Sequence, residues 1–280
     1  MTVLVCLNYR TKEETLEFIN GIVDYKLIDK IVLVDNHSED GSFKYFKENI
    51  KNKKVDVLTI EKNLGFAGGN DFGLEHAKQY NPDYLIVSNP DASFKERIVE
   101  RALELFKDNP KAGWVSFKCL SMDETFENPS INKFPKNVFS DYWELIWKTY
   151  KYKHYGINEV VKVDYMVTPL SFFRADAMYE IGMYDPTTFL YGEERILGYK
   201  FHQKGYEVIF DATTSYHHEG GTSTSISFES KAKLKFWLQS RKIYWFNHVK
   251  IGPLRKLELY ILQFFAYLSR RTKAIIHKEK

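Results

Sequence analysis

Four apolar runs in the first ninety residues alternate with stretches of helical character, and each run ends on polar residues. The runs lie at residues 2–7, 30–34, 55–60 and 84–92. They show little polar alternation, which is typical of strands buried on both faces of a sheet. Strands and helices in regular succession favour a mostly parallel sheet with helices on both faces. We therefore predict an α/β fold, which 280 residues can build around a full core.

The polar residues at the strand ends are candidates for a ligand site, because open α/β sheets bind ligands at the carboxyl ends of their strands. They are Asn8 and Tyr9 after the first strand, Asp35 and Asn36 after the second, and Asn89 and Asp91 after the fourth. A hard divalent cation is usually held by one or two carboxylates with phosphate oxygens and water. The stretch 84–92 is thus a candidate site for binding a nucleotide diphosphate, although the sequence Asn-Pro-Asp is equally typical of a turn.

Glycines gather between the third strand and the helix that we expect to end near residue 80. In the stretch from Asn63 to Asn70, Gly65, Gly68 and Gly69 allow close backbone approach and leave helix-entry amides free for an anion. The pattern is not a dinucleotide fingerprint, which would follow the first strand as G-x-G-x-x-G. A plain tight turn remains an alternative.

The second half of the chain contributes two further groups of candidates. We expect strands at 113–118, 162–166, 171–173 and 207–210, and a long irregular insertion at 121–158. Glu193 and Glu194 begin an amphipathic helix, where the helix dipole favours carboxylates whatever their function. His217 and His218 precede two glycines and could contact a metal or a phosphate, although paired histidines are more often structural.

The basic charge belongs to the end of the chain. From residue 228 onward there are 13 Lys and Arg against 3 Glu, a balance of +10, which leaves 27 against 34, or −7, for residues 1–227. A nucleic-acid binder would not normally show this distribution. Neither cysteine has metal-site spacing, and we find no leader and no run long enough to span a bilayer. We therefore expect a cytoplasmic protein.

Residues 228–280 form a predicted helical extension to a domain at 1–227. Bulky apolar residues recur there at helical spacing among cations, and Gly252-Pro253 divides two helices. Three roles remain open: the helices cap the larger domain, form a homodimer interface, or attach to an anionic membrane surface, where amphipathic basic helices settle readily.

The order of these motifs over residues 2–223 resembles the family 2 glycosyltransferases, particularly their bacterial rhamnosyltransferase-like branch. The similar stretches are NLGFAGGN (63–70), SNPD (88–91), VDN (34–36), IGMYDPTTFLYGEE (181–194) and HHEGGTS (217–223). The resemblance implies a GT-A fold with a nucleotide site formed by Asn8, Tyr9, Asp35, Asn36, Asn63, Gly68, Gly69, Asn70 and Asn89. It also implies Mg²⁺ or Mn²⁺ on Asp91, helped by His217, with Glu194 as catalytic base beside Glu193.

The implied reaction is inverting sugar transfer from dTDP-rhamnose or a UDP-sugar to a glycan or lipid-linked acceptor in cell-surface polysaccharide synthesis. There are departures from the family's pattern. Asn89 stands where a first aspartate is expected, Glu194 replaces an aspartate, and Val167-Thr168 stands where relatives tend to have Ser-Gly. A non-catalytic sugar- or nucleotide-binding protein and a sugar nucleotidyltransferase are the alternatives.

Overall fold

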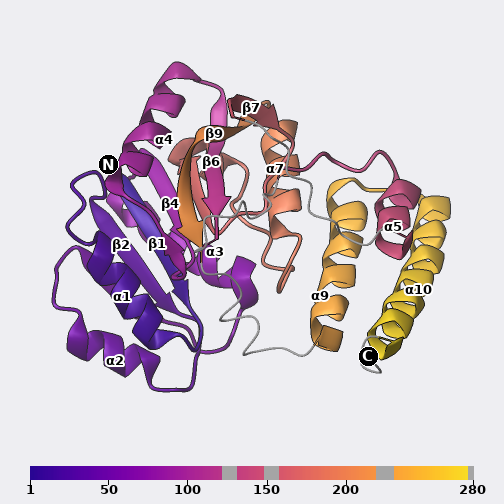
Figure 1. Ribbon diagram of the computed structural model, residues 1–280, viewed down its shortest axis with the longest axis horizontal. Helices are drawn as coiled ribbons and strands as arrows, with labels where there is room; N and C mark the ends of the chain where they lie inside the picture. Colours follow the sequence, from indigo (N-terminus) through magenta and orange to yellow (C-terminus); the bar gives the residue numbers. More distant parts are fainter. Residues whose placement is uncertain (122–130, 148–157, 219–229, 277–280) are drawn as a thin grey trace.

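The computed structural model describes residues 1–121, 131–147, 158–218 and 230–276, which build one sheet flanked by helices (Figure 1). The strands are β1 (Thr2–Asn8), β2 (Lys30–Asp35), β3 (Val55–Thr59), β4 (Tyr84–Ser88), β5 (Ala92–Ser93), β6 (Ala112–Leu120), β7 (Val160–Val163), β8 (Leu170–Arg174) and β9 (Glu207–His218). Their order is β3-β2-β1-β4-β8-β6-β9-β5, with β7 on β9. The predicted strands are all present in the described chain.

The first four strands pair in parallel, as their apolar runs predict. In this part of the sheet β1 lies between β2 and β4, and β3 lies outside β2. The carboxyl ends of all four strands therefore meet at one edge. β8 enters antiparallel between β4 and β6, and β6 pairs in parallel with β9. The sheet is thus largely parallel, with antiparallel strands at β8 and, on β9, at β5 and β7.

Helices cover both faces of the sheet. They are α1 (Lys12–Ile22), α2 (Ser42–Asn49), α3 (Gly65–Ala77), α4 (Glu96–Asp108), α5 (Val138–Trp147), α6 (Ala175–Glu180), α7 (Glu193–Gln203), α9 (Ser230–Ile243) and α10 (Pro253–Ile276), with a π-helical turn η2 (Tyr244–His248) after α9. One core joins the sheet to α1, α2 and α4. A second core on the opposite face joins it to α3, α6 and α7.

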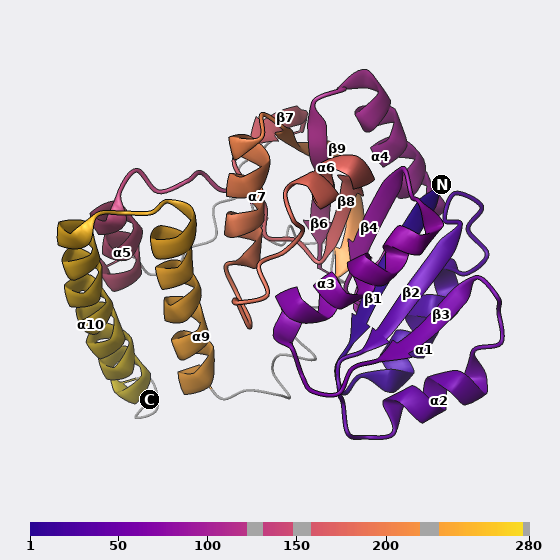
Figure 2. The same cartoon turned by 180° about the vertical axis from the view of Figure 1, so that it is seen from behind.

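A third core lies at one end of the molecule. Helices α5, α9 and α10 stand beyond α7 and away from the sheet in both views (Figures 1 and 2). Tyr142 of α5, Ile196 of α7, Leu238 of α9 and Leu259 of α10 are buried together there. The C-terminal helices thus pack on α5 and α7. Residue 227, where we expect the domain boundary, lies outside the described residues.

Two segments differ from their sequence-based expectations. Helix α3 begins at Gly65, so most of the expected glycine loop is helical. Gly65 has a φ of +73°, a conformation that glycine adopts without steric cost. The expected irregular insertion contains α5, whose apolar residues pack in the third core. Local sequence gave little sign of this helix, because its partners α9 and α10 lie about a hundred residues further along the chain.

Candidate functional site

A cleft opens at the edge of the sheet where β1, β2 and β4 end. The cleft is partly open to solvent and has a cavity volume of about 100 Å³. Its lining comprises Leu7, Tyr9, Thr11, Asn36, Asn63, Gly65, Phe66, Asn89, Pro90, Phe189 and Leu190. Four candidates for the nucleotide site, Tyr9, Asn36, Asn63 and Asn89, are thereby brought together. The segment that leads into α7 forms the remaining wall.

Asn8 and Asp35 lie beneath this cleft and do not line it. Asp35 Oδ1 accepts hydrogen bonds from Asn8 Nδ2 at 2.8 Å and from Ser38 Oγ at 2.5 Å. Asn8 is fully buried, and its Oδ1 also accepts a hydrogen bond from the Thr15 hydroxyl at 2.9 Å. These contacts fix the ends of β1 and β2 against each other. Ser38 and Thr15 were not expected from the sequence, because only the folded register brings them to Asn8.

Asn36 fixes the loop that enters α3. Its Nδ2 donates to Asn63 Oδ1 and to the Gly65 carbonyl, both at 3.1 Å. Its Oδ1 accepts the backbone N–H of Leu64 at 3.0 Å. Asn63 in turn accepts the Gly65 N–H at 2.8 Å. The two asparagines therefore determine the position of the α3 N-terminus at the cleft.

The glycines of α3 permit close packing around the cleft. A Cβ on Gly65 would lie 2.1 Å from the Phe189 carbonyl oxygen, and that oxygen accepts the Phe66 N–H at 2.8 Å. A Cβ on Gly69 would lie 2.7 Å from a methyl group of Leu7 on β1. Gly68 packs against Leu64, the residue that precedes the helix. A side chain at Gly65 would push α3 away from the segment before α7, and one at Gly69 would push it away from the sheet.

Asn70 lies in the second turn of α3 and is almost completely buried. Its Nδ2 donates to the Phe66 carbonyl at 3.0 Å. Within the described part of the chain its Oδ1 has no hydrogen-bond partner. Asn70 does not line the cleft, but its hydrogen bond joins it to Phe66, which does.

The end of β4 presents Asn89 and Pro90 to the cleft and turns Asp91 inward. The Asp91 side chain is 8% exposed, and its Oδ2 lies 3.0 Å from His218 Nε2. The pairing of Ala92 with His218 in the β5–β9 ladder produces this contact. Asp91 Oδ1 is buried and has no hydrogen-bond partner among the described residues. An unpartnered buried carboxylate oxygen beside the cleft suits a divalent cation.

His218, rather than the expected His217, is the histidine that contacts Asp91. His217 pairs with Ser93 one position further along the same ladder. Burial lowers the pKa of His218, but its hydrogen bonds to Asp91 and Cys119, together with the negative charge of Asp91, outweigh burial and raise it to about 10. The sequence could not distinguish the two histidines, because the strand register decides which one reaches Asp91.

A cation at Asp91 would need ligands from outside the protein. No group of three or more His, Cys, Asp or Glu side chains within the described ranges is arranged to hold a metal ion. Mg²⁺ is commonly bound by one or two carboxylates plus substrate phosphates and water. The residues around Asp91 therefore fit an ion that arrives together with a phosphate ligand.

The two adjacent carboxylates begin α7 behind the wall of the cleft. Gly192 precedes them with a φ of +81°. Glu193 is buried, and burial followed by the charge of Glu194 raises its pKa well above the usual value. Glu194 retains some exposed surface, and burial raises its pKa to about 7. Two adjacent carboxyl groups with raised pKa values can divide proton-donating and proton-accepting roles.

Helix α9 holds the segment before α7 in place. The ring of Phe236 stacks on that of Phe189 at 4.7 Å between centroids. Ser240 Oγ donates to the Leu190 carbonyl at 3.4 Å. A Cβ on Gly192 would lie 3.1 Å from that of Ser240, so the backbone passes close to α9. The C-terminal extension thus supports the cleft, a role that the sequence did not indicate.

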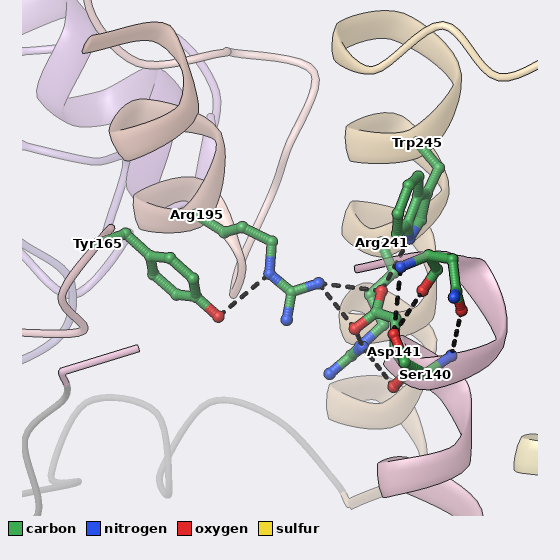
Figure 3. A network of polar contacts seen from close by, with 7 residues as sticks. Ser140, Asp141, Tyr165, Arg195, Arg241 and Trp245 are labelled. Atoms are coloured by element: carbon green, nitrogen blue, oxygen red, sulfur yellow. Dashed lines mark hydrogen bonds and ion pairs between the residues drawn. The ribbon is translucent and has the colours of Figure 1, made fainter. Parts of the chain in front are cut away.

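A charged network connects the same helices behind the site (Figure 3). Arg195, the residue after Glu194, donates to both carboxylate oxygens of Asp141 on α5. Arg241 of α9 and the indole N–H of Trp245 also donate to Asp141. All four side chains are largely buried. The sequence did not indicate this network, because Arg195, Arg241 and Trp245 lie 54 to 104 positions from Asp141.

Comparisons with known structures support the same fold. Similar chains include the crystal structure of GalNAc-T7 with UDP, GalNAc and Mn²⁺ (14% identity, TM-score 0.57, 89% of this chain and 49% of that one). A second is the mannosyltransferase PcManGT from Pyrobaculum calidifontis with GDP-Man and Mn²⁺ (14% identity, TM-score 0.58, 98% of this chain and 75% of that one). A third is S. aureus TarS 1-349 with UDP-GlcNAc (11% identity, TM-score 0.57, 92% of this chain and 70% of that one). This chain spans about half of the GalNAc-T7 chain. The predicted GT-A type of α/β fold is confirmed.

Sequence comparison gives the family. No curated protein matches the chain. The family model described as glycosyl transferase family 2 matches residues 2–182. Since these residues make up well over half of the chain and contain the cleft's strand ends and the glycines of α3, the protein belongs to glycosyl transferase family 2.

Proposed function

We propose that this protein transfers a sugar from a nucleotide diphosphate sugar to an acceptor hydroxyl, with inversion at the anomeric carbon. The observation that carries the proposal is that one cleft is lined both by the end of β4 and by the segment leading into α7. The first carries Asp91, and the second leads to Glu194. A leaving diphosphate and an attacking hydroxyl need these two kinds of group within one site.

The donor site is proposed at the strand ends. Tyr9, Asn63 and Asn89 offer an aromatic ring and amide groups to the nucleotide. Asp91 would hold Mg²⁺ or Mn²⁺, with Asn89 acting through water, His217 nearby and His218 orienting the carboxylate. A bound cation neutralises the charge that develops on the leaving diphosphate. The glycosyltransferases with Mn²⁺ and UDP or GDP-Man described above support this choice.

Glu194 is the proposed base. A pKa of about 7 leaves a substantial fraction of the carboxylate ionised at neutral pH, and a base with that pKa accepts a hydroxyl proton efficiently. Glu193, whose pKa is raised by burial and by the charge of Glu194, would donate a hydrogen bond to the acceptor. Direct attack by the deprotonated hydroxyl on the face opposite the diphosphate gives inversion.

The substrate classes rest on the resemblance of SNPD and NLGFAGGN to the rhamnosyltransferase-like branch. We propose dTDP-rhamnose as the first donor to test, followed by UDP-hexoses and UDP-galactofuranose. The acceptor would be a glycan or lipid-linked hydroxyl used in cell-surface polysaccharide synthesis.

The proposal is tested by screening these donors for thermal stabilisation of the protein in Mn²⁺ and in EDTA. A true donor raises the melting temperature only with the metal, and it is then slowly hydrolysed to free sugar when no acceptor is present. Binding without any hydrolysis or transfer would identify a non-catalytic binder. Turnover of a nucleoside triphosphate with a sugar phosphate would identify a nucleotidyltransferase.

A further inference from the structure

Helix α10 exposes a continuous apolar face, which we call the α10 stripe. Its side chains are 40% to 84% exposed and recur three or four residues apart, so they lie along one side of the helix. They are Leu254, Leu257, Tyr260, Ile261, Phe264, Phe265 and Leu268. Leu259 and Ala266 on the opposite side are fully buried in the third core. The helix is therefore already packed on one face, and the stripe is additional apolar surface.

The stripe is part of a larger concentration of exposed apolar residues at the same end of the molecule. Phe139 and Trp143 of α5 are each 47% exposed, and their rings stack at 5.2 Å. Helix α5 packs beside α10 (Figures 1 and 2). Nine of the thirteen large exposed hydrophobic side chains in the described residues therefore lie on these two helices. An exposed apolar surface of this extent marks a site of interaction.

The charge of the surrounding chain distinguishes the possible occupants. Residues 228–280 carry a balance of +10. Arg255 and Lys250 are exposed next to the start of the stripe. A second copy docked through the stripe would bring two such basic regions together, and like charges at an interface oppose association. An anionic lipid surface has the complementary charge and attracts basic segments by about 1 kcal/mol per Lys or Arg near the surface.

The geometry of α10 suits a helix that lies in the interface of a bilayer. From Leu254 to Leu268 the stripe extends over roughly 20 Å, at about 1.5 Å per residue. Leu, Ile, Phe and Tyr side chains along one face, with basic residues around it, are typical of interfacial helices. No helix in the described chain is long and apolar enough to cross a membrane. We infer that the α10 stripe docks this protein on an anionic phospholipid bilayer, with the helix axis along the membrane plane.

The test is sedimentation of the full chain with vesicles of phosphatidylglycerol and phosphatidylcholine, and with vesicles of phosphatidylcholine alone. We expect binding to the anionic vesicles that weakens with salt, and much weaker binding to the neutral ones. The double variant Phe264→Ser/Phe265→Ser should lower the partition coefficient at least about tenfold, since it removes two large apolar side chains from the stripe. Phe72→Ser, which changes a 40% exposed ring on α3, is the matched control and should bind like the wild type.

Two outcomes would overturn the inference. One is failure of the wild type to sediment with anionic vesicles, or equal sedimentation of the double variant. The other is a lipid-free dimer, measured by light scattering, that becomes monomeric in the double variant, because a second copy would then occupy the stripe. Both rings are more than half exposed, so the variant should keep its far-ultraviolet circular dichroism and melting temperature, which excludes unfolding as the cause.

Discussion

The carboxylate of Asp141 on α5 accepts two hydrogen bonds from the guanidinium group of Arg195 on α7, each at 3.0 Å. Arg241 of α9 contacts the same carboxylate, and its guanidinium group lies 3.9 Å from the ring centre of Trp237. One negative charge therefore holds two buried positive charges, each from a different helix. Because Arg195 follows Glu194, this arrangement fixes the start of α7 against the C-terminal helices.

Asp141→Asn should destabilise the fold strongly. The substitution keeps the side chain's shape but leaves two guanidinium groups facing each other without a counter-charge. Breaking a buried pair in this way costs on the order of 3–5 kcal/mol. The free energy of unfolding, measured in urea, gives the loss. Transfer activity should also fall, since Glu194 depends on the position of α7.

The control for Asp141→Asn is Glu258→Gln, which breaks the surface pair between Arg255 and Glu258 on α10. Surface ion pairs contribute about 0–1 kcal/mol. Equal losses of stability in the two variants would show that the charge of Asp141 has no special role in the third core.

Gly65→Ala should be far more damaging than Gly205→Ala, although both glycines have positive φ values, +73° and +80°. Placing any L-residue in this region costs roughly 1–2 kcal/mol. At Gly205 nothing lies within 4 Å of the added Cβ, so this cost should be the whole effect. At Gly65 the Cβ would meet the Phe189 carbonyl oxygen. The backbone of α3 or of the segment before α7 would then have to move.

Two measurements check the glycine pair. The melting temperature should fall further for Gly65→Ala than for Gly205→Ala, and only Gly65→Ala should weaken donor binding, because the cleft wall shifts. If the two variants lose the same stability and bind donor alike, the close approach of α3 to Phe189 does not shape the site.

The sequence predicted the parallel part of the fold well, because buried strands produce apolar runs that need no knowledge of partners. The ends of β1, β2 and β4 were located for the same reason, and Tyr9, Asn36 and Asn89 do line one cleft. Helix α5 was missed, since its stability comes from distant helices rather than from local periodicity. The local sequence pattern also could not predict that β8 runs antiparallel to its neighbours.

In the candidate site, too, some features could be predicted from the sequence and others could not. Residue types at strand ends could be read from the sequence, but their pairing depends on register. The contact between Asp91 and His218, the support of Phe189 by Phe236, and the link from Arg195 to Asp141 all join segments more than forty residues apart. No local signal could predict such contacts.

Asp91→Asn should abolish the metal dependence of donor binding. The substitution preserves shape but removes the charge that would hold a cation. With Mn²⁺ present, we expect the dissociation constant of the donor to rise at least about tenfold, since hydrogen bonds and contacts to charged groups contribute about 1.5–3 kcal/mol. Titration calorimetry with and without EDTA measures the effect.

Asp56→Asn is the matched control for Asp91→Asn. Asp56 on β3 also lies 3.0 Å from a histidine Nε2, that of His76, but it is remote from the cleft. Its substitution should leave donor affinity and the response to EDTA unchanged. Should Asp91→Asn keep a wild-type response to EDTA, the cation must be held elsewhere.

Glu194→Gln should nearly eliminate transfer while leaving donor affinity within a few fold, because the amide cannot accept the acceptor's proton. For the wild type, kcat/KM should fall about tenfold per pH unit below a pKa of about 7, where the base becomes protonated. Rates measured from pH 5 to 9 test this. A flat profile, or full activity of the variant, would remove Glu194 from the role of base.

The same variant should be more stable than the wild type at high pH. Burial raises the pKa of Glu194 from 4.5 to about 7 in the folded state, so between these pH values the folded protein binds more protons than the unfolded chain. Wild-type stability therefore falls as pH rises through this window and loses nothing more from Glu194 above it. A glutamine side chain does not ionise, so the variant does not lose stability in this way.

The difference in the free energy of unfolding between the variant and the wild type should be absent below pH 4.5 and reach on the order of 1–3 kcal/mol above pH 7. Urea unfolding at pH 4.5 and pH 8 measures it. A variant less stable than the wild type at pH 8 would show that the ionised carboxylate is stabilised in the fold, contrary to the effect of its burial.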